Sequence, residues 1–149
     1  MLFRSLWHRL TLDKRKPAML DPATGPFVSV LIPCFNEEKV IVSSVERILA
    51  STWERLEILV LDDGSSDATS EVVRQAFADN PRVSLLTFEN GGKATALNKG
   101  LAQTKGDIVV ALDADTLFHP ETLARLPAGL SIPRSAPWPA TPLSATALI

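Results

Sequence analysis

VSVLIPCFNE, residues 28–37, is the stretch that decides the fold, because a continuous apolar run there stops abruptly in a polar turn. A strand buried on both faces of a parallel sheet requires such a run. The pattern recurs at Ile58–Leu61, before Asp62-Asp63, and at Ile108–Leu112, before Asp113-Ala114-Asp115. In an open parallel sheet, ligands bind at the edge formed by the carboxyl ends of the strands. The three polar turns are therefore predicted to meet at that edge.

Segments with helical spacing alternate with the apolar runs. Asn36 and Asp67 are the expected N-caps of two helices, with Glu37 and Glu38 in the first turn of the earlier one. The alternation predicts an α/β fold with a parallel sheet and right-handed crossovers. The expected strands are Val28–Ile32, Leu56–Leu61, Val83–Phe88 and Asp107–Leu112. The expected buried positions of the two helices are Ile41, Val45, Ile48, Leu49, Val72, Val73, Ala76 and Phe77.

Two later helices are expected as well. The first covers Lys93–Thr104, and Gly106 is placed as its stop signal. The second begins near Pro120, a residue that suits a first helical turn, and runs to about Leu126.

Composition limits the classes of function. The chain has 149 residues, about one domain, and 46% of them are hydrophobic, which is enough for a core. The net charge of −2 provides no basic balance, so no nucleic-acid partner is expected. Cys34 is the only cysteine, which suits a reducing compartment and predicts a cytoplasmic location. No apolar run approaches the roughly 18 residues that a membrane-spanning helix needs.

Three segments are expected along the chain. Residues 1–26 form a lead and linker, within which Met1–Leu12 has the composition of a short amphipathic helix on a membrane surface, an ordinary terminal helix or a disordered lead-in. Residues 27–126 form the folded domain. Residues 127–149 are rich in proline, with Arg134 as the only charge, and show no helical or strand period.

The aspartates of the third turn are candidate metal ligands. If this segment stays extended, Asp113 and Asp115 project to the same side and Ala114 points away. Together with the doubled aspartate of the second turn, they would crowd four carboxylates at one edge, which calls for a cation among them. A divalent ion that holds a diphosphate is the economical explanation. A solvated turn or a helix cap is the alternative.

The remaining turns point less specifically to a ligand. Asp62-Asp63-Gly64-Ser65 has turn-forming residues, but a cap needs only one carboxylate, so the second is available for a base or a ribose. Asn90-Gly91-Gly92-Lys93 combines flexible backbone with one ammonium group, which suits a phosphate.

These motifs, in this order and spacing, resemble family 2 inverting glycosyltransferases of the GT-A (Rossmann-like) fold over Phe27–Leu126. The stretch GGKATALNKG, residues 91–100, is similar to the processive branch that makes polysaccharides. The resemblance implies a UDP-sugar donor, Mg²⁺ or Mn²⁺, and a glycan or lipid-linked acceptor. It also implies a parent enzyme associated with the cytoplasmic face of a membrane.

The resemblance also implies roles for single residues. Asp115, together with Asp113, is the expected metal ligand, and Asp115 is the more direct of the two. The residues implied to hold the nucleotide-sugar are Pro33, Phe35, Asn36, Glu37, Asp63, Lys93 and Asp113.

Family members continue well beyond the matched region, and their catalytic base lies in that continuation. No residue here is identified as the base, and the GT-A fold is expected to be incomplete at the C-terminus. A truncated or frameshifted remnant that binds a nucleotide-sugar without turnover is therefore the main alternative. Asp113-Ala114-Asp115-Thr116 also resembles the first motif of haloacid-dehalogenase phosphatases, although that motif normally ends the first strand. A sugar nucleotidyltransferase would place a glycine-rich loop where Pro33-Cys34-Phe35 stands.

Overall fold

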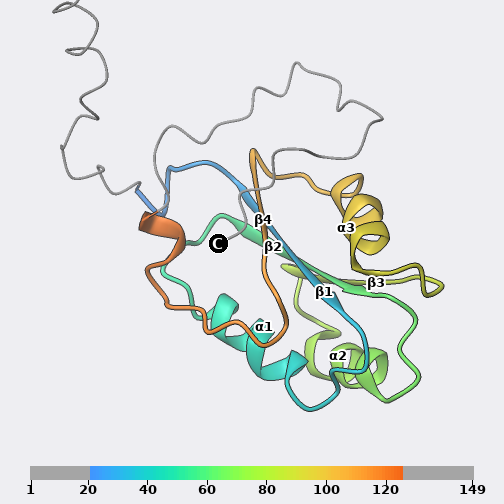
Figure 1. The fold of residues 1–149 in the computed structure, drawn as a ribbon. Coiled ribbons are helices and arrows are strands. Elements are labelled where there is room, and N and C mark those ends of the chain that lie inside the picture. The colour runs from blue at the N-terminus through green and yellow to red at the C-terminus, as the bar shows by residue number, and fades with distance from the viewer. Residues whose placement is uncertain (1–20, 126–149) are drawn as a thin grey trace, which may run out of the picture.

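The computed structural model describes residues 21–125, which contain a four-stranded, fully parallel sheet (Figure 1). The strand order is β3-β2-β1-β4, so the chain first adds strands on one side of β1 and then crosses to the other side. The parallel α/β prediction is confirmed, and each strand lies within two residues of its expected bounds. The strands are β1 (Val28–Cys34), β2 (Leu56–Asp62), β3 (Val83–Thr87) and β4 (Ile108–Ala111).

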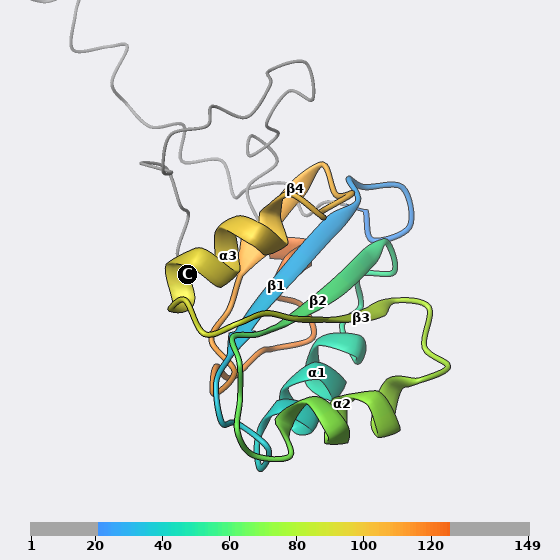
Figure 2. The same cartoon turned by 90° about the vertical axis from the view of Figure 1, so that its right-hand side faces the viewer.

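Helices cover both faces of the sheet (Figures 1 and 2). Helices α1 (Ile41–Leu49) and α2 (Thr69–Phe77) pack on one face, and α3 (Lys93–Leu101) packs on the other. A short 3-10 helix, η2 (Leu123–Arg125), adds two buried residues to the cluster on the α1 side. The result is a three-layer domain in which the sheet separates two hydrophobic clusters.

Side chains along β1, β2 and β4 alternate between the faces, so the parity of the residue number gives the face. Even-numbered residues such as Val30 and Ile58 pack under α1 and α2, whereas odd-numbered residues such as Leu31 and Leu59 pack under α3. This parity determines which polar residues at the carboxyl ends of the strands reach the α3 side.

The first helix begins later than expected. Asn36 has a φ of 56°, in the left-handed region that a right-handed helix excludes. Helix α1 instead begins at Ile41, with Val40 at its N-cap. The expectation that Asn36 caps this helix, with Glu37 and Glu38 in its first turn, is therefore wrong.

The second helix differs less. Its N-cap is Ala68, one residue after the expected Asp67, although Asp67 Oδ1 does accept the Thr69 N–H at 2.9 Å. Val73 is buried and two other predicted positions are half-buried, but Ala76 is exposed.

The later helices are shorter than expected. Helix α3 ends at Leu101 rather than Thr104. Gly106 is not a helix stop; it lies against β1, where a Cβ would come within 2.5 Å of the Ser29 nitrogen. Pro120 begins a turn that leads into η2 rather than into an α-helix.

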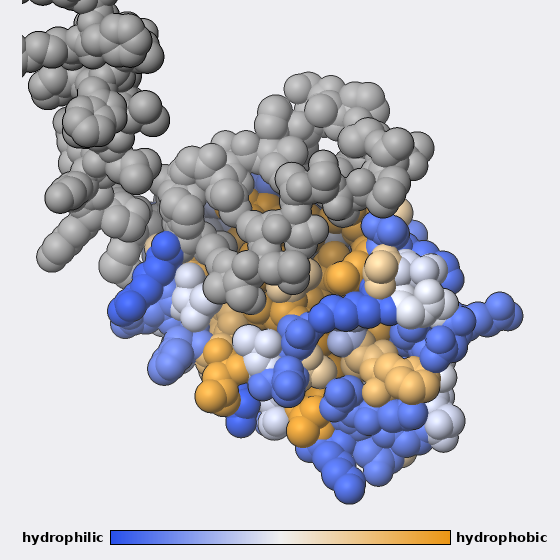
Figure 3. Space-filling model, in the orientation of Figure 1, coloured by the Kyte–Doolittle hydropathy of each residue, from blue (hydrophilic) through white to orange (hydrophobic). Residues whose placement is uncertain are grey.

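Residues 21–125 contain no helix that is long and apolar enough to cross a membrane. The expectations for Met1–Leu12 and for residues 127–149 lie outside the described part of the chain. On the face seen in Figure 3, hydrophobic surface lies towards the middle of the described part, with hydrophilic side chains around it. The large hydrophobic residues that are exposed in the described range are Phe35 and Leu117, at 48% and 78%.

Candidate functional site

A cavity of about 280 Å³ lies at the carboxyl ends of the strands. β1 stands between β2 and β4 there, which is the point where the strand order reverses and where open α/β sheets bind ligands. Of the residues that the resemblance assigns to the nucleotide-sugar or the metal, all except Asn36 line this cavity. The lining residues are Pro33, Cys34, Phe35, Glu37, Asp63, Lys93, Asp113, Ala114 and Asp115.

Asp63 joins two of the loops around the cavity. It is 5% exposed, and its Oδ1 accepts the Gly91 N–H at 3.0 Å. The two loops also touch through their backbones, because a Cβ on Gly64 would lie 2.8 Å from the Asn90 nitrogen. Gly64 has a φ of +78°, so glycine is required there for two separate reasons. Asp63 thus lies at the cavity and also fixes the loop that leads to Lys93.

Lys93 and Asp113 form an ion pair across the cavity through Nζ and Oδ1. Their side chains are 52% and 56% exposed, so solvent screens the pair and its contribution to stability is small. The pair joins the lysine that follows β3 to the aspartate that follows β4. The sequence analysis assigned both residues to the nucleotide-sugar but did not predict that they pair with each other.

Asp113-Ala114-Asp115 is a turn rather than an extended segment. The Thr116 N–H donates to the Asp113 carbonyl at 3.0 Å, and β4 has already ended at Ala111. Ala114 points into the core, and its carbonyl accepts a hydrogen bond from the Ser44 hydroxyl of α1. Both aspartates remain exposed and line the cavity, so they share one side through turn geometry and not through strand alternation.

Asp62 does not belong to the carboxylate group that the sequence predicted. Its even number places it on the α2 face, where Oδ1 accepts the Ser65 N–H at 2.8 Å and Oδ2 accepts the Ser70 hydroxyl. The expectation of four aspartates around one ligand is corrected to three, because Asp62, the last residue of β2, faces α2, whereas Asp63, the next residue, lines the cavity.

Ala114 is a lining residue that sequence reasoning missed, and Cys34, inside the Pro33–Glu37 stretch of the motif, also lines the cavity without a role of its own having been expected. The Cys34 thiol is 4% exposed and donates to the Leu61 carbonyl at 3.6 Å. Burial, followed by the charges of Asp62, Glu37 and Asp67, raises the pKa of Cys34 to about 12. The thiol is therefore neutral at physiological pH and is a packing group, not a nucleophile. Its position at the end of β1, beside Pro33 and Phe35, was the available signal.

Asp113 and Asp115, the expected metal ligands, are both exposed carboxylates at the cavity. No cluster of three or more His, Cys, Asp or Glu residues able to hold a metal occurs within residues 21–125. Two carboxylates fit an ion such as Mg²⁺, which takes one or two carboxylates and completes its shell with water and phosphate oxygens. The residues present therefore suit a metal that binds together with a diphosphate.

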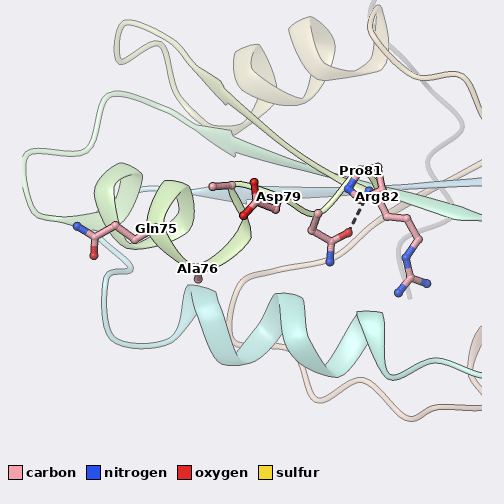
Figure 4. A pocket seen from close by; sticks show the side chains of 7 residues that line it. Gln75, Ala76, Asp79, Pro81 and Arg82 are labelled. Carbon is pink, nitrogen blue, oxygen red and sulfur yellow. Dashed lines mark hydrogen bonds between the residues drawn. The ribbon is translucent and has the colours of Figure 1, made fainter.

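A second hollow, of about 450 Å³, lies between the end of α2 and the start of β3 (Figure 4). Its residues include Gln75, Asp79 and Arg82, and the Asn80 side chain accepts the Arg82 N–H at 3.0 Å. It lies before β3, at the edge opposite the carboxyl ends, and contains none of the residues predicted to bind a ligand.

The parallel sheet and the acidic cavity at its switch point define an α/β domain of the GT-A type. The chain belongs to glycosyl transferase family 2, whose sequence model matches residues 29–136. The match continues past Leu126, the expected end of the domain.

Two curated relatives illustrate the range of the family. Poly-beta-1,6-N-acetyl-D-glucosamine synthase of Staphylococcus aureus (strain COL) is 37% identical over 109 residues, which are 73% of this chain and 26% of that protein. Undecaprenyl-phosphate 4-deoxy-4-formamido-L-arabinose transferase of Edwardsiella ictaluri (strain 93-146) is 40% identical over 114 residues, 72% of this chain and 35% of that protein. The chain therefore spans much less than half the length of these relatives.

Solved structures show the same architecture. A mannosyltransferase from Pyrobaculum calidifontis, in complex with GDP-Man and Mn²⁺, matches with a TM-score of 0.66 and 35% identity over 76% of this chain and 35% of that one. Glucosyl-3-phosphoglycerate synthase from Mycobacterium tuberculosis, in complex with Mn²⁺, UDP and glucosyl-3-phosphoglycerate, matches at 0.55 and 33% over 67% of this chain and 38% of that one. Both neighbours contain a nucleotide and Mn²⁺.

Proposed function

We propose that this domain binds the UDP-sugar donor of a glycosyltransferase that builds a glycan or polysaccharide, and that it does so with a divalent cation. The observation that carries the proposal is that one cavity is lined by all the residues implied to hold the nucleotide-sugar or the metal, apart from Asn36. The family membership supports the donor class, and the polysaccharide synthase relative supports the product class.

The nucleoside end of the cavity is assigned to the β1 and β2 loops. Phe35 is half-exposed at the wall and offers a ring face to a base. Asp63 uses Oδ1 for the Gly91 N–H, and its other oxygen makes no hydrogen bond within residues 21–125. That oxygen is available to accept from a base N–H or a ribose hydroxyl.

The diphosphate end is assigned to the β4 turn and the start of α3. Asp113 and Asp115 would hold the cation, which when bound offsets the charge of the diphosphate leaving group. Lys93 supplies a positive charge at the same place and would exchange its pairing with Asp113 for a phosphate oxygen. The Gly91-Gly92 backbone leads directly into the first turn of α3, which favours an anion.

The acceptor end has no assigned base. The carboxylates that line the cavity are those of Glu37, Asp63, Asp113 and Asp115, and all four are committed to the donor in this proposal. We therefore expect the 149-residue chain on its own to bind the donor without measurable sugar transfer. A glycan product formed from UDP-sugars, and lost on Asp115→Ala, would contradict this expectation. The family match leaves no support for the phosphatase alternative.

Calorimetric titration of the chain with UDP tests the proposal. We expect binding with Mn²⁺ that weakens by about tenfold or more in EDTA, since a metal-bridged diphosphate loses several charge-assisted contacts. GDP is the matched comparison, because one structural neighbour holds GDP-Man. Equal affinity with and without metal would overturn the metal assignment, and tighter binding of GDP would overturn the choice of UDP.

A further inference from the structure

Among the residues implied to hold the nucleotide-sugar, Asn36 is the one that does not line the cavity, although its neighbours Phe35 and Glu37 both do. Its backbone is in the left-handed region, with a φ of 56°. Asparagine adopts this conformation more readily than other non-glycine residues, but the conformation still has a cost. Because Asn36 lies between two residues of the cavity wall, its backbone conformation affects the positions of both Phe35 and Glu37.

Hydrogen bonds hold Asn36 against the turn that follows β2. Its Oδ1 accepts the Ser66 N–H at 2.8 Å, with longer contacts from the Ser66 hydroxyl at 3.3 Å and the Asp67 N–H at 3.4 Å. In return, the Asn36 N–H donates to Ser65 Oγ at 2.9 Å. The carbonyl oxygen of the Asn36 side chain is therefore already engaged by protein groups.

The next two residues repeat the pattern. The Glu37 N–H donates to Thr69 Oγ1 at 2.8 Å, and the Glu38 N–H donates to Asp67 Oδ2 at 3.2 Å. The Ala68 N–H donates to the Glu38 carboxylate at 3.0 Å. Residues 36–38 and 65–69 thus satisfy one another's backbone donors, and we call this set of contacts the loop clamp.

Asp62 stabilises the loop clamp through hydrogen bonds to the turn that follows β2. Its carboxylate accepts the Ser65 N–H at 2.8 Å and the Ser70 hydroxyl, which fixes the turn that holds Asn36. The two adjacent aspartates therefore have different roles. Asp63 lines the cavity, whereas Asp62 supports the loop clamp, and neither Asp62 nor residues 65–69 line the cavity themselves.

We propose that Asn36 is a positioning residue, which holds Phe35 and Glu37 in place on the cavity wall through the loop clamp and does not itself contact the nucleotide. The inference rests on the proposed nucleotide site for its effect on affinity. The arrangement of the wall that it describes exists without any ligand. Substitutions in residues 65–69 should consequently change nucleotide affinity from outside the cavity.

The first part of the test uses no ligand. The chain labelled with 4-fluorophenylalanine has six phenylalanine signals, and Phe35→Leu identifies the one from Phe35. We expect Asn36→Ala and Ser65→Ala to shift or broaden that signal and to leave the signal of the core residue Phe118 unchanged. An unchanged Phe35 signal in Asn36→Ala would overturn the proposal, whether or not any nucleotide binds.

The second part is titration with UDP and Mn²⁺. We expect Asn36→Ala to weaken binding by about tenfold, as removal of residues that orient a site commonly does, and Ser65→Ala to weaken it by about threefold. Asn36→Asp keeps the acceptor and should restore most of the affinity. Asn80→Ala is the matched control, because it removes an asparagine-to-backbone bond remote from the cavity and should leave affinity unchanged.

The outcomes separate the two proposals. If the unaltered chain binds no nucleotide, the proposed function fails, while the fluorine spectra still decide the role of Asn36. If Asn36→Ala weakens binding but Ser65→Ala has no effect on affinity or on the Phe35 signal, Asn36 is a direct contact and the positioning role is overturned.

Discussion

The two halves of the cavity are built in different ways. The β1 and β2 loops are joined by the loop clamp, in which backbone donors on each loop meet side-chain acceptors on the other. The α3 and β4 side is held across the cavity by the exposed pair of Lys93 and Asp113, together with the bond from Gly91 to Asp63. The half that we assign to the nucleoside is thus preorganised, whereas the half that we assign to the diphosphate can exchange its contacts when a charged ligand binds.

The largest expected effect is a loss of UDP affinity when a carboxylate is removed from the half that we assign to the diphosphate. Asp115→Ala should weaken metal-dependent UDP binding by about 2–4 kcal/mol, because it removes one of two carboxylates from a charge-assisted site. Calorimetry with Mn²⁺ measures the change. Asp79→Ala, an exposed aspartate at the second hollow, is the control and should leave binding unaltered. Loss of less than half a kcal/mol in Asp115→Ala would show that this turn does not hold the metal.

The contact between the Gly64 loop and the Asn90 loop joins the two halves, and a single added methyl group at Gly64 should lower the stability of the fold. Gly64→Ala places a Cβ 2.8 Å from the Asn90 nitrogen at a φ of +78°, and should lower the free energy of unfolding by about 2 kcal/mol. Gly92→Ala is matched in φ, at +85°, but its Cβ meets nothing within 4 Å, so about 1 kcal/mol is expected from strain alone. Urea denaturation of both variants measures the difference, and equal losses would refute a contact between the two loops.

Removal of the Lys93–Asp113 ion pair should change UDP affinity but leave the free energy of unfolding nearly unchanged. Lys93→Met should change the free energy of unfolding by less than about 0.5 kcal/mol, because the pair is half-exposed. It should weaken UDP binding by roughly 1 kcal/mol through loss of one cationic contact, yet strengthen the binding of Mn²⁺ alone, since Asp113 is released. Titration with each ligand tests the opposite signs. Lys99→Met, which removes a lysine stacked on Phe88, controls for net charge.

The smallest expected effect is a pH dependence in the clamped half. Desolvation alone would raise the pKa of Asp67, but hydrogen bonds from the Thr69 hydroxyl, the Thr69 N–H and the Glu38 N–H together lower it below the ordinary 3.8. The folded state therefore favours the carboxylate, and this contribution to stability is present above pH 3.8 and is lost as pH falls through the lower folded pKa. Urea midpoints measured from pH 6 down to pH 3 should fall less steeply in Asp67→Asn than in the unaltered chain. Parallel curves would contradict the assignment.

The sequence predicted the sheet and the convergence at its edge, because apolar runs and the polar turns after them are local signals. Strand alternation could also have removed Asp62 from the predicted carboxylate group, since Asp62 is the last residue of β2 and Asp63 follows it directly. The role of Asn36 was not accessible in this way. A local rule made it a helix cap, but its partners Ser65 and Ser66 lie about thirty residues away in the sequence. Contacts between loops over that separation depend on the register of β1 and β2, which a propensity does not supply.

The pairing of β1 with both neighbours has a consequence for the order of folding. Val28 pairs with Leu56 in β2 and with Ile108 in β4, so the second pairing closes a much longer stretch of chain. In an open chain the extra closure entropy amounts to about 0.9 kcal/mol, and such non-local pairings slow folding. β4 should therefore be the last strand to dock, and pulsed hydrogen exchange would show Ile108–Ala111 protected after β1 and β2. During folding, the β1 and β2 loops of the cavity would then form before Asp113 and Asp115 reach their places beside them.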